Sequence, residues 1–464
     1  MRFHRFGRHL IRVACFILFA STLLHAQGTT NNFTNGSGDG TWENPANWSL
    51  GHVPLSTEDV TIGGSLAARI APSDTSVQSI RSLTMTGTST LNFQGLELDI
   101  AQPSSVASGS TITVQHPTGC PPLTTLVLAS TSTLTVSGTL TVEGPCAVLR
   151  GAGTVIVKGH FDWIAPSSNL PGPTLGGDPG GTLNVMAGVG TLAITGTKHG
   201  LSTYTINNQH TVTWPNGASI QAGNGAVFNN LDGGTVSLLL GTQTFDNSLG
   251  GATPQFNNSG TFNSPGTFTF TGVPFTNTVT NGIPGTVGAG GNLVFGGGYT
   301  QTAGPTTLTT SVGPSGSISV GAAGFNLNGG ILNGTGTITG NVINNGGHVQ
   351  PGLSPTPGTL TITGNYTQGA GGILDLALAG TTAGNFSVLA ISGTATLGGT
   401  LNALSFGGFT PPASSSFQVM TFASRTGDFT TNNLTVNGVA LTKNFHTGDL
   451  TLVVKHRRGQ ITSQ

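Results

Sequence analysis

Carboxyl groups that could act as a pair are scarce in this chain of 464 residues, which has 15 Asp and Glu in all. Glu97 and Asp99, in the segment GLELDIAQ, are two residues apart, so a β-strand would point both side chains to one face. Glycoside hydrolysis usually requires two such neighbouring carboxyl groups. No His, Arg or Lys flanks the pair in sequence, however. We therefore expect a solvated outer face at Glu97 and Asp99 rather than a catalytic pair.

A second concentration of polar chemistry is the segment KGHFDW, which contains Lys158, His160, Asp162 and Trp163. A basic residue beside acidic groups is what a polysaccharide lyase would use, and an indole can stack on a sugar ring. These four residues are therefore candidates for carbohydrate contact. The simpler interpretation, which we favour, is a coil edge whose aromatic rings pack inward. We assign no catalytic residue to the chain.

The first 26 residues have the composition of a secretory signal. Four arginines precede the apolar run Val13–Leu24, and Ala26 supplies a small residue at a plausible cleavage position. A membrane-spanning anchor would need about 20 apolar residues, more than this run provides. The pattern predicts a cleaved signal and a soluble, exported mature chain.

Export also decides how the cysteines are interpreted. Cys15 lies in the signal, which leaves Cys120 and Cys146, and two thiols in an oxidising compartment most simply form one disulfide. A zinc site with nearby histidines is the alternative, but the close Cys and His spacing of zinc ligands is missing. The segment NGSGDGTW (35–42) is a single fragment of a calcium-binding roll, which needs tandem copies. We expect no metal and no cofactor.

Low charge limits the classes of partner. Charged residues make up 6% of the chain, against about 25% in ordinary soluble domains. Four of the 14 basic residues fall in the signal, so the mature chain is acidic, which argues against nucleic acid and anionic membranes. The hydrophobic fraction of 36% lies in regular alternating runs, which argues against disorder.

Short alternating runs such as GTLNVMAG, GTLAITGT and GTLTITGNYTQ recur along the chain, each ended by Gly, Asn or Pro. Period-two alternation between turn residues predicts strands, and helical periodicity is nearly absent. A string of β-sandwiches would have longer strands, so the shortness of the runs favours a solenoid. We predict an all-β, right-handed parallel β-helix. Asn pairs, such as Asn229 with Asn230 and Asn257 with Asn258, are interpreted as left-handed corner residues.

An open solenoid exposes unpaired strand edges at its ends, so both termini should carry caps. Trp42 and Trp48 would cover the first coil, and longer strands near the C-terminus suggest a partly antiparallel cap. The predicted organisation is a signal at 1–26, a linker and aromatic cap at 27–59, a parallel β-helix at 60–374, C-terminal β-rich coils and cap at 375–455, and a tail at 456–464.

The region from about Thr235 to Lys455 resembles bacterial surface β-helix proteins of the autotransporter-passenger and large-adhesin type. The resemblance lies in LNGGILNGTGTITGNVINNGG, in LAISGTATLGGTLNAL and in the spacing of Pro, Gly and Tyr across Pro351–Gln368. Phe386 and Ser387 stand where those proteins often carry Asp. No C-terminal membrane barrel follows, so export through its own barrel is not expected.

The resemblance implies a secreted or outer-surface protein that is not an enzyme. Its expected role is adhesion or matrix interaction through a Thr-, Asn- and Ser-rich face with exposed Phe, and its expected partners are polysaccharides or host and environmental surfaces. The alternative is a polysaccharide-binding or polysaccharide-degrading protein, a lyase or hydrolase, with its site near Glu97 and Asp99 or near Lys158–Trp163. A self-associating surface layer is the third hypothesis.

Overall fold

The computed structural model describes residues 28–116, 120–166, 170–309, 316–353 and 355–455. The predicted signal and the tail at 456–464 lie outside these residues. Within them the chain is almost entirely β-structure, with one helical turn, the 3-10 helix η1 (Pro45–Asn47). Among these residues, no helix has the length and apolar character to span a membrane. The strands wind into a parallel β-helix of about 15 turns, which confirms the predicted all-β parallel solenoid.

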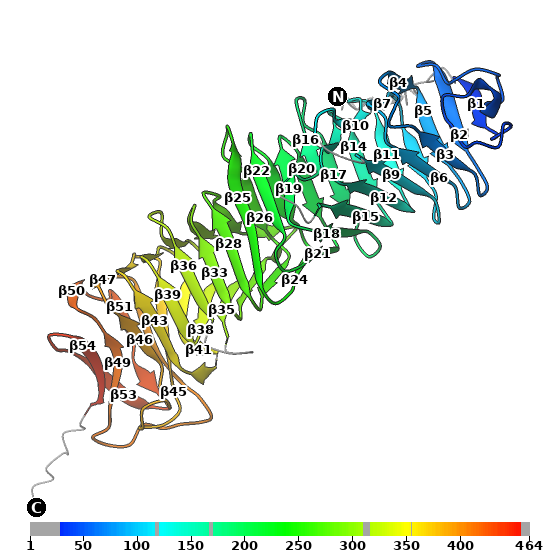
Figure 1. The fold of residues 1–464 in the computed structure, drawn as a ribbon. Helices are drawn as coiled ribbons and strands as arrows, with labels where there is room; N and C mark the ends of the chain where they lie inside the picture. The colour runs from blue at the N-terminus through cyan, green and yellow to red at the C-terminus, as the bar shows by residue number, and fades with distance from the viewer. Residues whose placement is uncertain (1–27, 117–119, 167–169, 310–315, 354, 456–464) are drawn as a thin grey trace, which may run out of the picture.

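Turns of the stack contribute strands to three parallel sheets, here called sheets A, B and C. Sheet A begins with β1 (Thr29–Phe33) and sheet C with β4 (Val77–Ile80). Figure 1 shows the result as a long rod, with the first strands in blue at one end and the last in red at the other. The parallel strands of sheet B are β3 (Ala67–Ile70), β6 (Thr90–Phe93), β9 (Thr111–Gln115), β12 (Thr139–Glu143), β15 (His160–Ile164), β18 (Thr191–Thr195), β21 (Thr211–Trp214), β24 (Thr235–Leu238), β27 (Thr261–Ser264), β32 (Thr286–Ala289), β35 (Pro305–Leu308), β38 (Ile331–Gly334), β41 (His348–Leu353), β45 (Ile373–Leu378), β48 (Thr400–Ser405) and β51 (Thr431–Asn433). The short strand β42 (Thr356–Pro357) pairs antiparallel with β41 in the same sheet.

Alternation within each strand decides which side chains enter the core. In β18, Leu192 and Ile194 are fully buried between the sheets, while Thr191 keeps part of its surface outside. Burying one aliphatic side chain of this size stabilises the fold by about 1.5–3 kcal/mol. Because side chains on a strand alternate between its two faces, a one-residue slip would expose this entire set. The hydrophobic pattern therefore sets the register of each strand.

Aromatic rings fill the middle of the core. Phe228, Phe256, Phe275, Tyr299 and Phe325 occupy equivalent positions on successive strands of sheet A. Neighbouring rings in this row are stacked with centroids 4.3–5.4 Å apart. Across the described residues every Phe is buried or half-buried. The expectation of exposed Phe on the binding face is therefore wrong, because the alternation points these rings inward.

Two asparagine ladders run where sheet A turns towards sheet B. The inner ladder is fully buried, and each Nδ2 donates to the next Oδ1 at 2.7–2.8 Å. Its members are Asn208, Asn230, Asn258 and Asn277. The outer ladder is half-exposed, with equivalent bonds of 2.8–2.9 Å. Its members are Asn184, Asn207, Asn229 and Asn257.

These ladders correct the interpretation of the Asn pairs as corner residues. Asn230 and Asn258 end the strands β23 (Val227–Asn230) and β26 (Gln255–Asn258), and neither has a positive φ. The left-handed positions belong to other asparagines, such as Asn224 with φ 52°. A side-chain amide that lies opposite an identical amide on the next strand can donate one hydrogen bond and accept another. This pairing explains why these asparagines lie at strand ends rather than in left-handed turns.

The two ends of the described stack differ in their contacts and strand pairing. At the first coil, the buried rings of Trp42 and Trp48 meet edge to face with centroids 4.6 Å apart. The free edge of β1 bonds to the following loop, where the Ser49 amide donates to the Asn32 carbonyl at 2.9 Å. At the other end, β49 (Ser416–Thr421) pairs antiparallel with β54 (Asp449–Val454), which pairs with β53 (Val439–Phe445).

Candidate functional site

Threonines line one edge of the outer face of sheet B over much of the stack. Nine successive strands place an equivalent outward residue at the same register, and eight of the nine are Thr. The row consists of Thr90, Thr111, Thr139, His160, Thr191, Thr211, Thr235, Thr261 and Thr286. Because neighbouring strands are about 4.8 Å apart, these hydroxyl groups repeat at that interval along the rod.

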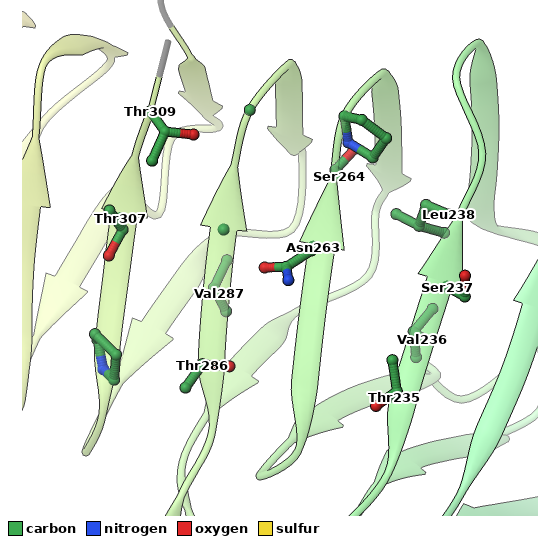
Figure 2. A pocket seen from close by; sticks show the side chains of 14 residues that line it. Thr235, Val236, Ser237, Leu238, Asn263, Ser264, Thr286, Val287, Thr307 and Thr309 are labelled. Atoms are coloured by element: carbon green, nitrogen blue, oxygen red, sulfur yellow. The ribbon is translucent and has the colours of Figure 1, made fainter. Parts of the chain in front are cut away.

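A shallow groove of about 580 Å³ lies on this face across β24, β27, β32 and β35. Figure 2 shows Ser237, Asn263 and Thr307 on neighbouring strands along it. Gly288 falls in the same register, opposite both Asn263 and Thr307. A Cβ atom there would come within 2.2 Å of the Asn263 Oδ1 atom, so glycine keeps the centre of the groove open. None of the described residues that line the groove is charged.

Exposed apolar side chains lie in the segments that directly follow or precede strands of the groove. Leu239 and Leu240 follow directly on β24 and are both exposed. The two-stranded hairpin of β30 (Val279–Thr280) and β31 (Ile283–Pro284) immediately precedes β32 and exposes Val279 and Ile283. The arrangement offers hydroxyl and amide groups on the floor and hydrocarbon in the adjoining segments. It can hydrogen-bond and pack against a neutral polyhydroxylated chain, and it supplies no acid or base.

The acid pair considered from the sequence lies on a different face. Glu97 and Asp99 point outward from β7 (Glu97–Ile100), a strand of sheet C. Arg150, on β13 (Ala147–Arg150), donates from Nη2 to the Glu97 Oε2 atom at 2.7 Å. Burial, followed by the nearby Glu97 carboxylate, raises the pKa of Asp99. Sequence reasoning missed this ion pair because Arg150 comes from a strand two turns farther along the chain.

The second set of sequence candidates is divided between the surface and the core. His160 and Asp162 lie on the outer face of β15, and Lys158 is exposed in the turn before it. Trp163 is fully buried, and its Nε1–H group donates to the Pro173 carbonyl at 3.1 Å. The buried indole agrees with the inward packing that we favoured from the sequence, and it leaves no ring face accessible for sugar stacking. The period-two pattern that exposes His160 and Asp162 necessarily points the indole into the core.

Asp162 does have an acidic neighbour that the sequence did not reveal. Glu143 lies on β12, where it is opposite Ile164, so its carboxyl is diagonal to that of Asp162. Burial raises the pKa of both groups, and the charge of Asp162 adds to the effect at Glu143. The Nδ1 atom of His160 is 2.6 Å from the Thr191 hydroxyl. This cluster lies several strands from the groove.

Cys120 and Cys146 form a disulfide with Cα atoms 6.0 Å apart. His116, one of the two histidines (with His160) of the alternative zinc site, is buried, and burial lowers the pKa of its imidazole. In the described part of the chain, no three His, Cys, Asp or Glu side chains are grouped so that they could hold a metal ion. The disulfide therefore stands as a covalent link between two neighbouring turns.

Comparison with known proteins adds no family to this geometry. No family model matches the chain, and no curated protein matches it. The surface of the stack is therefore the basis on which a function is assigned.

Proposed function

We propose that this protein is a secreted, non-enzymatic β-helix protein that binds neutral polysaccharide on cell or matrix surfaces through the outer face of sheet B. The observation that carries the proposal is the uncharged groove across β24, β27, β32 and β35, with exposed apolar residues in the segments next to β24 and β32. Sugar hydroxyls both donate and accept hydrogen bonds, as the Thr, Ser and Asn side chains of the groove do. The C–H faces of pyranose rings can pack against Leu239, Leu240 and Ile283.

Repetition supports an extended ligand rather than a small one. The hydroxyl row repeats every strand, at about 4.8 Å, which is similar to the length of one pyranose unit in an extended glycan. Each hydrogen bond to a neutral group contributes little net free energy, because it replaces one to water. A long chain that engages many equivalent positions at once gains affinity through effective concentration. Adhesion through many weak contacts is the mode that such a face suits.

The distribution of acids favours binding over catalysis. Glu97 and Asp99 lie on sheet C, while Asp162 and Glu143 lie on sheet B several strands before the groove. Glycoside hydrolysis needs two carboxyl groups flanking the bound sugar, and the groove offers none among its described residues. Export is supported by the composition of residues 1–26 and by the disulfide, which persists in oxidising compartments.

A second candidate function is polysaccharide hydrolysis at Glu97 and Asp99. It is favoured by one observation, the ion pair of Glu97 with Arg150 next to an Asp99 carboxyl of raised pKa. Neighbouring carboxyls whose environments push their pKa values apart can serve as acid and base. Cleavage of neutral or acidic polysaccharides by the wild type, lost in Glu97→Gln, would establish this function in place of binding.

The binding proposal is tested with isosteric substitutions that remove hydroxyl groups only. The groove variant is Thr235→Val with Thr286→Val and Thr307→Val. The matched control carries Thr276→Val, Thr300→Val and Thr367→Val on the outer face of sheet A. Against a panel of neutral oligosaccharides and polysaccharides, the groove variant should bind about tenfold more weakly or worse, since each lost hydrogen bond costs about 0.5–1.5 kcal/mol.

The control variant should bind as the wild type does. Equal losses in the two variants would show that the groove is not the contact surface. Failure of the wild type to bind any neutral glycan would overturn the proposal itself.

A further inference from the structure

A second concave site lies farther along sheet B, beside Asp375 on β45. This carboxylate is the first charged side chain of the sequence after Asp246, and it is 6% exposed. Its Oδ2 atom accepts hydrogen bonds from the His348 Nδ1 atom at 2.7 Å and from the Gln350 Nε2 atom at 3.0 Å. Its Oδ1 atom accepts from the Asn402 Nδ2 atom at 2.7 Å. Three donors from the neighbouring turns therefore fix the orientation of the carboxylate.

A cavity of about 280 Å³ opens next to this carboxylate. Asp375, Gln350 and Ser405 contribute polar atoms to its wall, and Pro351 and Leu404 contribute hydrocarbon. Leu404 is nearly half exposed, so hydrocarbon is accessible at the opening. The volume lies near the lower limit of small-ligand pockets, about 300 Å³, which suits one sugar ring.

The wall of the cavity is held in place by a buried serine. The Ser387 hydroxyl donates to the Pro351 carbonyl at 2.7 Å and accepts from the Ala377 amide at 3.1 Å. Both partners line the cavity, so Ser387 ties β41 to β45 on its two sides. The pocket is formed by strands and their hydrogen bonds, which makes it preorganised for a ligand.

The same register connects the cavity with the groove. Thr307, at the end of the groove, lies opposite Asn333, and Asn333 lies opposite Gln350. Gln350 in turn bonds to Asp375. Three strand steps of about 4.8 Å separate Thr307 from Asp375, a span of about 14 Å. One glycan chain of a few more units can therefore occupy both places.

We propose that the cavity beside Asp375 is a subsite for a single neutral pyranose residue of the glycan that the groove binds. This inference rests on the proposed function. Vicinal hydroxyls of the ring would donate to the Asp375 carboxylate and bond to the Gln350 amide, while Leu404 and Pro351 would pack against a C–H face. A uronic acid would place a second negative charge against Asp375, and no described residue that lines the cavity is basic. The subsite therefore selects neutral sugars over acidic ones.

The test fills the cavity without touching the carboxylate network. Ala377 faces the cavity from β45, and Ala377→Leu would occupy part of it. Ala390, a half-buried outward residue on β46 (Val388–Ile391) of sheet C, gives the matched control Ala390→Leu. Binding of neutral disaccharides, a uronate disaccharide and neutral oligosaccharides of eight or more units is measured by calorimetry on the full chain. The longer probes are chosen to span about 14 Å and the groove beyond it.

The subsite predicts that a neutral disaccharide binds the wild type and Ala390→Leu equally, and binds Ala377→Leu about tenfold more weakly. The uronate disaccharide should bind more weakly than the neutral ones. Disaccharide binding that Ala377→Leu leaves unchanged would overturn the subsite. A second result would also overturn the subsite but leave the groove proposal standing. In that result, long oligosaccharides bind, their binding is weakened in the groove variant, and no disaccharide binds.

The reverse pattern separates the two claims. If disaccharides bind and depend on Ala377, but longer chains bind no tighter, the subsite stands and the groove proposal fails. If no probe binds, both are overturned. Circular dichroism spectra of Ala377→Leu and Ala390→Leu that match the wild type show that a loss of affinity is not a loss of fold.

Discussion

Asn258 provides the sharpest test of how the stack is held together. Its side chain sits fully buried in the inner asparagine ladder, where Nδ2 donates to the Asn277 Oδ1 atom at 2.8 Å and Oδ1 accepts from Asn230 at 2.7 Å. The preceding residue, Asn257, makes the same kind of bond to Asn229 at 2.9 Å but on the half-exposed outer ladder. The two residues share a side chain and adjacent positions, but Asn258 is buried and also donates to the Gly260 and Thr286 carbonyls at 3.2 and 3.1 Å. Asn258→Ala and Asn257→Ala form a matched pair.

The expected loss of stability depends on which hydrogen-bonding groups each substitution leaves without a partner. Asn258→Ala leaves the Asn277 Oδ1 atom and one Asn230 N–H group buried without this partner, and each such group costs about 1–3 kcal/mol. We expect a loss of about 2–5 kcal/mol in the free energy of unfolding, since the substitution also leaves a small void. Asn257→Ala leaves its neighbours in reach of water, so its cost should stay near 0.5–1 kcal/mol.

The assay is urea unfolding followed by circular dichroism, combined with hydrogen exchange resolved to peptides. Exchange locates the damage even where a solenoid unfolds in segments. Asn258→Ala should accelerate exchange in β23, β26 and β29 (Phe275–Asn277), and Asn257→Ala should not. Equal effects of the two substitutions would refute the claim that the buried ladder is a main source of stability.

Three further predictions concern the acid pair, the disulfide and the core. Asp99→Asn should stabilise the protein at pH 7 and have little effect at about pH 3, as measured by urea unfolding at both values. Folding raises the pKa of Asp99, so this acid favours the folded state only when it is protonated. That contribution is lost as the pH rises through the raised pKa. Reducing the disulfide, which joins residues 26 apart, should cost about 3.5 kcal/mol, measured with and without dithiothreitol; a double variant with Cys120→Ala and Cys146→Ala should not respond to the reductant. Phe270→Ala should cost about 3–5 kcal/mol because its ring contacts six neighbouring aromatic rings. The outward neighbour Thr269→Ala should stay within about 0.5 kcal/mol of the wild type, and a comparable loss there would contradict the assignment of core and surface.

The fold was accessible from the sequence because one signal, period-two alternation, is repeated in almost every strand. The alternation in a segment such as Thr191–Thr195 predicts both that a strand forms and which of its faces is buried. The sequence does not indicate which strands pair, because the number of residues between equivalent positions on paired strands varies. Ile331 lies opposite His348, 17 residues on, while His160 lies opposite Thr191, 31 residues on.

That variable spacing explains which site features were missed. The partnership of Glu97 with Arg150 spans 53 residues, and the pairing of Asp162 with Glu143 depends on the register of β12 and β15. The groove likewise appears only when strands β24 to β35 are placed side by side. By contrast, the inward packing of Trp163, which we favoured over sugar stacking, could be predicted from the sequence. Its alternation with His160 and Asp162 already placed the ring on the inner face.

The asparagines show a different limit. The residue type suits both left-handed corners and stacked amide ladders, so composition alone does not separate the two. Asn224 takes the first role and Asn258 the second. The distinguishing sign is recurrence of the Asn pair as the last two residues of a strand in successive turns, as at Asn207, Asn229 and Asn257.

Hydrogen exchange of the full chain with and without a neutral oligosaccharide tests the central claim most directly, because it reports which sheet the ligand covers. We predict slower exchange in β24, β27, β32 and β35 of sheet B, with sheets A and C unchanged. Protection centred on β7 and β13, where Glu97 and Arg150 meet, or cleavage of the oligosaccharide during the measurement, would contradict it.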